Sequence, residues 1–379
     1  MSEQRQADDR SLTVVPLAGP RDLRRFIDLP RQLYADDPCF IPPLAFEQRQ
    51  RFSPKSPYAA HARWQGWLAL AGDRPVGRIT AQVDRLERDP SLGYFGMLEA
   101  DRPDAVGPLV AAASDWLRAA GKTRVRGPLN LHINEEVGLL VEGFDTPPVV
   151  LMGHGKPWYD AALRAAGFTG VKDLLAYRTR PDFEAPKVMT RLAERASRRV
   201  TIRSLRRRDL AQEAETMRRI FDDAWANNWG FAPLDPAAWA DTVSTLAKLL
   251  PEDYIQFAEV DGEPVAFIVA LPNLNEAARD LDGRLLPFGW LRFLWRLKVS
   301  GVSSARIPLM GVTQAYQHSR LGPTVAFMII DAVRQALHGR GVTEVEMGWI
   351  LEDNAGMRNI IETIGGEAYK RYRVYEKDL

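Results

Sequence analysis

The sequence predicts a mixed α/β fold built from two similar units, each with helices packed on a mixed sheet. Short apolar segments alternate with segments in which apolar residues recur at helical spacing, and the order of these segments in the first half returns in the second. The chain of 379 residues is also long enough for two ordinary domains, and 46% of its residues are hydrophobic and 26% charged.

The first half contains one set of elements. Residues 21–51 have the pattern of helix and loop, and a hairpin follows in which residues 71–75 form the turn. The two hairpin strands span residues 64–70 and 76–83. The elements expected beyond the hairpin are a strand at 94–98, a helix at 105–120, a strand at 124–130, a helix at 157–167 and a strand at 174–178.

The second half contains a similar set, and its last part has the clearest pattern. The expected elements there are a strand at 306–312, a helix at 324–337, a strand at 343–350, a short helix after Asn354 and a strand at 368–375. Pro323 precedes the first of these helices and Gly339 follows it, which are the usual positions of the two residue types at helix ends.

Three matches in the same order indicate an internal duplication, although any two α/β domains share some such pieces. The matching segments are 72–81 with 261–270, 121–127 with 341–348, and 159–177 with 357–375. The predicted domain limits are a disordered tail at 1–11, an N-terminal domain at 12–181, a linker at 182–199 and a C-terminal domain at 200–379.

Charge and cysteine content exclude several classes of function. The formal net charge of +1 gives no reason to expect a nucleic-acid partner. Cys39 is the only cysteine, so the chain has no intramolecular disulfide or cysteine-rich metal site. No apolar run approaches the ~20 residues that span a bilayer, and the first residues lack the apolar core of a signal peptide. We therefore expect a cytoplasmic protein without a metal ion.

The order strand, loop, helix, strand, helix, strand in residues 305–377 resembles the acetyl-CoA-binding half of the GNAT acyltransferases. The start of a helix presents free N–H groups and a positive dipole, which can hold a diphosphate without a metal. The resemblance implies acyl-CoA as co-substrate, with strand N–H groups that bind the oxyanion. The residues that it implies for this site are Met310, Val312, Gln317, Arg320, Gly322 and Asn354.

The chain departs from the family pattern at two positions. Arg320 stands where the middle glycine of the phosphate loop is expected. Ile361 stands where the family has a tyrosine that protonates the departing thiolate, and Tyr369 and Tyr372 are the candidates to replace it. Asn354 is also explained as a simple helix cap.

A long irregular connection at residues 127–155 carries several polar side chains. Loops of this length in compact domains are often functional. His132, Glu135, Glu136 and His154 are candidates to take a proton from an attacking amine. The alternative is a hydrogen-bonded surface loop with solvated carboxylates.

Two aromatic segments are candidates for acceptor binding. In the GNAT fold, a helix and loop cover the acceptor site, and Asn228, Trp229 and Phe231 lie in the corresponding loop. Core packing is the alternative there. The second segment, residues 285–298, combines Trp290 and Trp295 with three cations, a composition typical of a helix at a membrane surface. The alternative is an insertion helix packed on the body of the protein.

Several segments together resemble one group of bacterial tandem GNAT-like proteins: 26–34, 133–136, 143–148, 228–231 and 349–354. This group is similar to the bacterial ceramide synthase, which joins a long-chain acyl group from acyl-CoA to a sphingoid-base amine. The resemblance implies an N-acyltransferase of lipid metabolism, peripheral on the inner membrane. The alternatives are acetylation of a small amine, aminoacyl transfer from tRNA, and a non-catalytic binding module.

Overall fold

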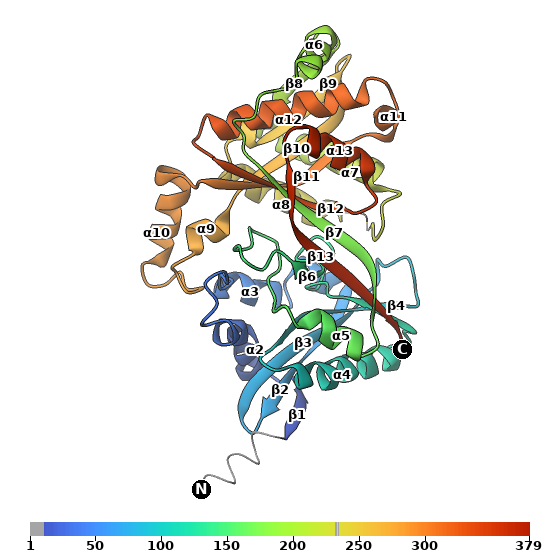
Figure 1. Cartoon of the computed structure of the whole chain (residues 1–379), viewed down its shortest axis with the longest axis vertical. Coiled ribbons are helices and arrows are strands. Elements are labelled where there is room, and N and C mark those ends of the chain that lie inside the picture. Colours follow the sequence, from blue (N-terminus) through green and yellow to red (C-terminus); the bar gives the residue numbers. More distant parts are fainter. Residues whose placement is uncertain (1–10, 232, 234) are drawn as a thin grey trace. The chain divides into compact units, whose positions relative to one another are not determined.

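The computed structural model describes residues 11–231, 233 and 235–379, and it has the mixed α/β architecture that the sequence predicts (Figure 1). Residues 1–10 of the predicted tail lie outside the described residues. The chain forms two compact units. Unit 1 contains the residues up to Leu174 together with Ala278–Phe293 and Lys370–Leu379, and unit 2 contains Leu175–Ala277 and Leu294–Tyr369.

These units are not two uninterrupted halves of the chain. Strands β7 (Thr169–Thr179) and β13 (Glu367–Asp378) contain the limits between the units, as do helices α9 (Leu274–Ala278) and α10 (Gly289–Trp295). A helix, α6 (Lys187–Ala196), occupies much of the predicted linker at 182–199. The predicted domain limits describe the repeat in the sequence, and they stay a prediction.

Unit 1 has the strand order β1-β2-β3-β4-β5-β13, and β6 also pairs with β13. All neighbours in this order are antiparallel except β4 and β5, which are parallel. The elements are β1 (Leu12–Pro16), α2 (Pro20–Leu33), α3 (Ala45–Arg51), β2 (Ala62–Ala71), β3 (Arg74–Asp84), β4 (Leu92–Ala100), α4 (Val106–Ala119), β5 (Arg124–Gly127), β6 (Leu139–Glu142) and α5 (Tyr159–Ala165). The sequence pattern did not predict β1 or β6.

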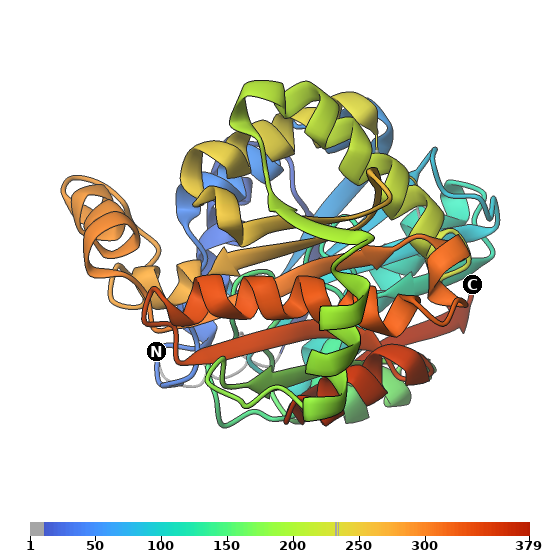
Figure 2. The same ribbon diagram turned by 90° about the horizontal axis from the view of Figure 1, so that it is seen from above.

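Unit 2 has the strand order β7-β12-β11-β10-β9-β8. Its helix α12 lies along β9, β10 and β11 (Figure 2). The elements are β8 (Val200–Ser204), α7 (Leu210–Trp225), α8 (Pro236–Leu249), β9 (Ile255–Val260), β10 (Glu263–Pro272), β11 (Ser304–Val312), α11 (Gln314–Gln317), α12 (Gly322–His338), β12 (Glu344–Leu351) and α13 (Ala355–Thr363). A π-helical turn, Arg296–Ser300, follows α10.

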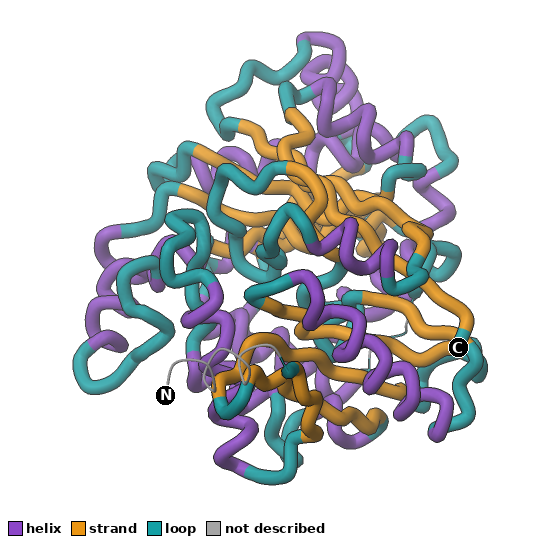
Figure 3. The backbone as a smooth tube through the Cα atoms, turned by 60° about the horizontal axis from the view of Figure 1, so that its bottom comes forward, coloured by secondary structure: helices purple, strands orange, loops and turns teal. Residues whose placement is uncertain are grey.

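The predicted repeat is confirmed by the topology, because the same pattern of strand pairing occurs in both units. Figure 3 distinguishes the helices, strands and loops of the chain by colour. In unit 1 the hairpin β2–β3 is followed by β4, which pairs antiparallel with β3 and parallel with β5. In unit 2 the hairpin β9–β10 is followed by β11, which pairs antiparallel with β10 and parallel with β12. The two hairpins therefore occupy equivalent positions.

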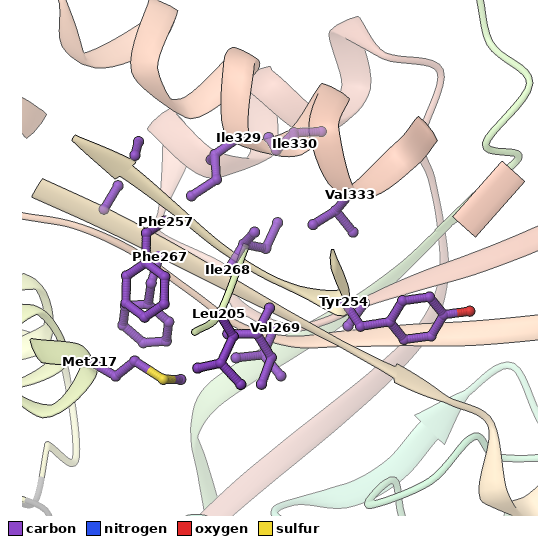
Figure 4. Close-up of a cluster of buried hydrophobic side chains, with 14 of the residues drawn as sticks. Leu205, Met217, Tyr254, Phe257, Phe267, Ile268, Val269, Ile329, Ile330 and Val333 are labelled. Atoms are coloured by element: carbon purple, nitrogen blue, oxygen red, sulfur yellow. The ribbon is translucent and has the colours of Figure 1, made fainter. Parts of the chain in front are cut away.

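The apolar faces that the helical spacing predicts form the core of unit 2. Ile329 and Val333 of α12 are fully buried against the strands, and the fully buried Phe257 and Phe267 belong to the same cluster (Figure 4). Met217 of α7 reaches the same cluster. Burying each of these side chains contributes about 1.5–3 kcal/mol, so the core fixes α12 against the strand β11 that precedes it.

Candidate active site

The two parallel strands β11 and β12 pair along only the first part of their length and then separate. Their register runs from Ser304↔Glu344 to Ile307↔Met347 and ends there. The antiparallel register between β10 and β11 shifts at the same point along β11, next to Pro308. Proline has no N–H for a ladder and is found at such bulges, which bend the strand. The bulge therefore marks where β11 leaves β12.

Beyond the bulge, the main-chain groups of Met310 and Val312 point toward the side that β12 has left. Thr313 donates its N–H to the carbonyl oxygen of Val265 on β10 at 2.9 Å. In an antiparallel ladder, alternate residues face the partner strand. Thr313 and Gly311 therefore face β10, whereas Met310 and Val312 face away from it. Both residues are half-buried, so a ligand can reach them.

The loop after β11 is fastened to this strand and to the end of α7. Gln317 donates from Nε2 to the carbonyl oxygen of Val312 at 2.7 Å and to that of Ala224 at 3.2 Å. Gln317 is thus a structural part of the expected phosphate loop. His318 and Arg320 are exposed in the same loop, where a cation at position 320 can meet an anionic ligand.

Gly322 begins α12 in a crowded position. A Cβ atom at this residue would lie 2.1 Å from the carbonyl oxygen of Tyr316, so only glycine fits without a shift of the main chain. Ser319 accepts at Oγ from the N–H of Gly322 at 3.1 Å and from that of Leu321 at 3.2 Å. The start of the helix is therefore capped by the loop itself.

Two further positions of the family pattern have structural explanations in unit 2. Asn354 caps α13, because its side chain accepts from the N–H of Met357 at 3.1 Å. Ile361 has only 2% of its surface exposed and lies in the core. An apolar residue at position 361 serves packing, so a proton donor has to come from another residue.

A buried polar cluster lies on β11 and β12 where they begin to separate. Arg306 and Glu346 have 4% and 2% of their side-chain surface exposed, and Arg306 Nε lies 3.6 Å from Glu346 Oε1. Arg306 also donates to the carbonyl oxygen of Gly348 at 2.9 Å. Tyr369 donates its hydroxyl to Glu346 Oε2, and the Arg178 guanidinium lies 5.4 Å from its ring centre.

Of this cluster, the sequence reasoning identified Tyr369 and missed Arg306 and Glu346. A signal for them existed, because each is a charged residue inside an apolar strand segment. Charged side chains are almost never fully buried unless they are paired. Opposite charges inside two neighbouring parallel strands are therefore a pattern that predicts an ion pair.

In unit 1 the equivalent strands β4 and β5 also separate, but the chain itself fills the opening. Leu129 donates its N–H to the carbonyl oxygen of Phe95 at 2.8 Å, and the Asn130 side chain accepts from the N–H of Met97 at 2.7 Å. A Cβ atom at Gly96 would lie 1.9 Å from the carbonyl oxygen of Leu129. The predicted strand at 124–130 ends at residue 127 because the next residues fold onto β4.

Two of the predicted acid–base residues, Glu135 and Glu136, share one cation in unit 1. Arg51, with 7% of its side-chain surface exposed, lies 2.8 Å from each carboxylate. Burial raises the pKa of the Glu135 carboxyl to about 7. Burial acts in the same direction on Glu136, but Arg51 outweighs it and lowers the pKa of that carboxyl. The pair can therefore hold one exchangeable proton near neutral pH.

The two predicted histidines of the same connection have different surroundings. Burial lowers the pKa of the His132 imidazole to about 4, and its Nδ1 accepts from the N–H of Asn134 at 2.9 Å. His154 has 4% of its side-chain surface exposed, and its Nε2 lies 2.8 Å from Asp37 Oδ2. Both rings are therefore held by neighbours within unit 1.

A buried network that the sequence reasoning missed lies near His154. Tyr34 donates its hydroxyl to the Glu99 carboxylate, and the hydroxyl of Tyr159 lies 3.2 Å from the same carboxylate. Arg78 Nη2 is 3.9 Å from Glu99. Burial raises the pKa of the Glu99 carboxyl, which the two hydroxyl donors and Arg78 oppose.

The end of α7, from which the predicted acceptor loop continues, lies against the strand β11. Trp225, which precedes it, stacks on Phe221 with ring centres 4.6 Å apart, and a Cβ atom at Gly311 would lie 2.5 Å from its ring. Asn228 accepts at its carbonyl oxygen from the N–H of Phe231 at 3.2 Å. Phe231 packs on the core of unit 2.

Of the other acceptor candidates, Trp229 is half-buried in this loop. Trp290 and Trp295 have 43% and 56% of their surface exposed on α10. Two groups of the predicted residues therefore assemble. One joins Met310, Val312, Gln317, Arg320 and Gly322 around the end of β11, and the other joins Glu135 and Glu136 around Arg51.

Comparison with known proteins identifies close relatives. No family model matches the chain. It is 47% identical over 363 residues to protein YghO of Escherichia coli (strain K12), covering 94% of this chain and 93% of that protein. It is 44% identical over 375 residues to the bacterial ceramide synthase of Caulobacter vibrioides (strain NA1000 / CB15N), covering 97% and 98%.

Among solved structures, a tandem GNAT protein from the clavulanic acid biosynthesis pathway matches with a TM-score of 0.56. The match covers 97% of this chain and 98% of that one, and 15% of the aligned residues are identical. Similarity at this level concerns the fold, and it shows that the two repeats have the tandem GNAT architecture.

Proposed function

This chain belongs to the family of bacterial ceramide synthase and protein YghO, and we propose that it transfers an acyl group from acyl-CoA to the amine of a lipid such as a sphingoid base. That it is a GNAT-type N-acyltransferase follows from these relatives together with the fold. The acyl donor, the lipid acceptor and the place of the reaction are the proposed parts.

The observation that carries the proposal is the open end of β11. Met310 and Val312 turn their N–H groups away from β10, at the level where the parallel ladder with β12 has ended. Preorganised main-chain donors of this kind stabilise the oxyanion of acyl transfer. The pantetheine arm of acyl-CoA is an extended chain with amide groups, so it can pair with such a strand edge as a further strand would.

The phosphate groups of acyl-CoA are proposed to lie at the loop between β11 and α12. The exposed guanidinium of Arg320 supplies charge there, and the start of α12 supplies the helix dipole. Gln317 holds the loop against Val312, which keeps the loop and the oxyanion donors in a fixed relation.

The reaction is a direct transfer. The acceptor amine nitrogen attacks the thioester carbonyl carbon, an N–C bond forms, the C–S bond breaks, and the thiolate leaves. The amine gives up one proton and the thiolate gains one, so the products are an amide and free CoA. A base with a pKa near the working pH is the most effective proton acceptor. Glu135, whose carboxyl contacts Arg51 within unit 1 and has its pKa raised to about 7, stays a proposed acid–base residue of that unit.

On the side of the thiolate, Tyr369 is the proposed proton donor. Its hydroxyl contacts the buried Glu346 at the strand separation, in the same unit as Met310 and Val312. Glu346, which is itself paired with Arg306, holds the tyrosine in position. His132, Glu136 and His154 are proposed to hold the connection that carries Glu135, because neighbouring groups bind each of them.

A pair of variants at one residue tests the oxyanion donors. Met310→Pro removes the N–H that faces away from β10 and leaves the ladder with β10 intact, whereas Met310→Ala keeps that N–H. We expect Met310→Pro to lower kcat by ~10²–10³-fold, the usual effect of losing one oxyanion donor, and Met310→Ala to change it by less than ~10-fold. Circular dichroism checks that both variants fold. Equal activity of the two folded variants would reject this site.

A further inference from the structure

Exposed apolar side chains are concentrated in one short segment, residues 284–300, which contains α10 and the π-helical turn after it. Among the described residues, seven of the thirteen exposed large hydrophobic side chains lie here. They are Leu286 (79% exposed), Phe288 (74%), Trp290 (43%), Leu291 (50%), Leu294 (40%), Trp295 (56%) and Val299 (70%). Apolar patches of this kind mark interaction surfaces.

The exposed side chains of α10 lie on one side of the helix. At about 100° per residue, Trp290, Leu294, Leu291 and Trp295 fill a continuous arc of roughly 140°. Arg292 follows directly beyond this arc, and the half-buried Phe293 lies on the opposite side. The helix therefore presents an apolar face outward and flanks it with a cation.

The segment is held in place by its C-terminal part and by Arg292, whose Nη1 lies 3.0 Å from Asp280 Oδ2, so its outward face is not the result of a loose chain. Arg296 donates to the carbonyl oxygen of Ala277 at 2.9 Å. Lys298 donates to the carbonyl oxygen of Leu249 at 2.8 Å, where helix α8 ends. A lysine at the C-terminal end of a helix also interacts favourably with the helix dipole.

The charge of the segment selects its partner. Residues 284–300 contain Arg284, Arg292, Arg296 and Lys298 and no aspartate or glutamate, whereas the whole chain has a net charge of only +1. Arg292 is paired with Asp280 just outside the segment, so the excess positive charge comes from the other three cations. A second copy of this chain would place two such cationic segments against each other. A bilayer with anionic headgroups complements both the apolar face and the charge, and tryptophan and arginine are well suited to the interface of water and lipid.

We propose that residues 284–300 form a docking element that inserts its apolar face into the surface of an anionic bilayer. No helix among residues 11–231, 233 and 235–379 is long and apolar enough to cross a membrane. The proposed docking element therefore lies along the interface between water and lipid. This inference rests on the proposed function: an enzyme that acylates a lipid amine has to reach its acceptor at the membrane surface, and the docking element would bring it there.

Vesicle sedimentation tests the docking element. We expect the protein to sediment with vesicles of phosphatidylglycerol and phosphatidylcholine, to bind phosphatidylcholine alone more weakly, and to bind less at high salt. Trp290→Glu with Trp295→Glu should lower the bound fraction by at least ~10-fold, because two carboxylates would have to enter the interface. The control is Phe46→Glu with Val188→Glu, which adds the same charge at exposed apolar residues outside the segment.

The outcomes separate this proposal from the proposed function. Wild-type protein that stays in the supernatant with both kinds of vesicle overturns the docking element, as does equal loss of binding in the control variant. If such protein still forms an amide from acyl-CoA and a detergent-dispersed lipid amine, the proposed function stands. Binding to vesicles without amide formation from any lipid amine overturns the proposed function and leaves the docking element in place.

Discussion

The buried pair of Arg306 and Glu346 should be one of the most costly places to change in unit 2. Both side chains are almost fully buried, and their closest charged atoms are 3.6 Å apart. Glu346→Leu would leave the Arg306 guanidinium buried without its carboxylate and would remove the acceptor of the Tyr369 hydroxyl. Arg306→Met would leave the opposite charge buried.

The expected magnitude follows from this distance. With an effective dielectric constant of ~20, two unit charges 3.6 Å apart attract each other by about 5 kcal/mol. The loss of hydration on burial offsets much of this attraction in the intact pair, but removing one partner leaves an uncompensated charge and costs about 3–5 kcal/mol. Changing both residues to apolar ones of similar volume removes both charges, so the double variant should lose less than the sum of the single losses.

A double-mutant cycle measures this coupling. The free energy of unfolding is obtained from urea titrations of wild type, Arg306→Met, Glu346→Leu and the double variant, followed by far-UV circular dichroism. We expect each single variant to lose about 3–5 kcal/mol, and the double variant to recover at least ~2 kcal/mol of the sum. Single losses below ~1 kcal/mol, or losses that simply add, would contradict the reasoning.

Three further predictions concern the other parts of the site. Gly96→Ala should destabilise unit 1 by about 3 kcal/mol or more, because its Cβ would clash with the Leu129 carbonyl, whereas Gly107→Ala in helix α4 meets no atom and should stabilise by up to ~1 kcal/mol; thermal unfolding checks both. Arg320→Glu should weaken binding of CoA at least ~10-fold in calorimetry, and unchanged affinity in a folded variant would move the phosphate site elsewhere. In urea titrations, the free energy of unfolding of the wild type should fall by ~1–3 kcal/mol between pH about 4.5 and 7 because of Glu135, and Glu135→Gln should remove this fall.

Proton binding by Glu135 decides whether the free energy of unfolding rises or falls with pH. The Glu135 carboxyl has an ordinary pKa of 4.5, and burial raises the pKa to about 7 in the folded chain. Between these values the folded state binds more protons than the unfolded state, so the free energy of unfolding falls as the pH rises. If the wild type instead becomes more stable over this pH range, and Glu135→Gln abolishes that rise, the raised pKa of Glu135 is contradicted.

The sequence predicted the parts of the fold that depend on periodicity and on the residues at element ends. Helix α12 spans Gly322–His338 where residues 324–337 were expected. The predicted strand at 124–130 is longer than β5, because the pattern of residues 128–130 does not reveal that they fold onto β4. Strands β1 and β6 were not predicted, since short strands depend on their pairing partners for stability.

The candidate site was predictable only in part, and the reason is geometrical. Met310 and Val312 were identified from a family resemblance, but their orientation depends on which residues of β11 pair with β10, which the sequence does not reveal. The partners of Glu135 and Glu136 come from position 51, far away in the chain. The Arg306 and Glu346 pair has a sequence signal, a charged residue inside each of two apolar strand segments.

We propose that this chain joins an acyl group from acyl-CoA to a lipid amine at the open end of β11. The most direct measurement is mass spectrometry of the purified protein incubated with long-chain acyl-CoA and a sphingoid base in detergent, with free thiol counted in the same sample. We predict one amide formed for each CoA released, product that requires both substrates, and at least a ~10²-fold loss of rate in Met310→Pro but not in Met310→Ala. Release of CoA without amide, or turnover confined to acetyl-CoA and a water-soluble amine, would contradict the account.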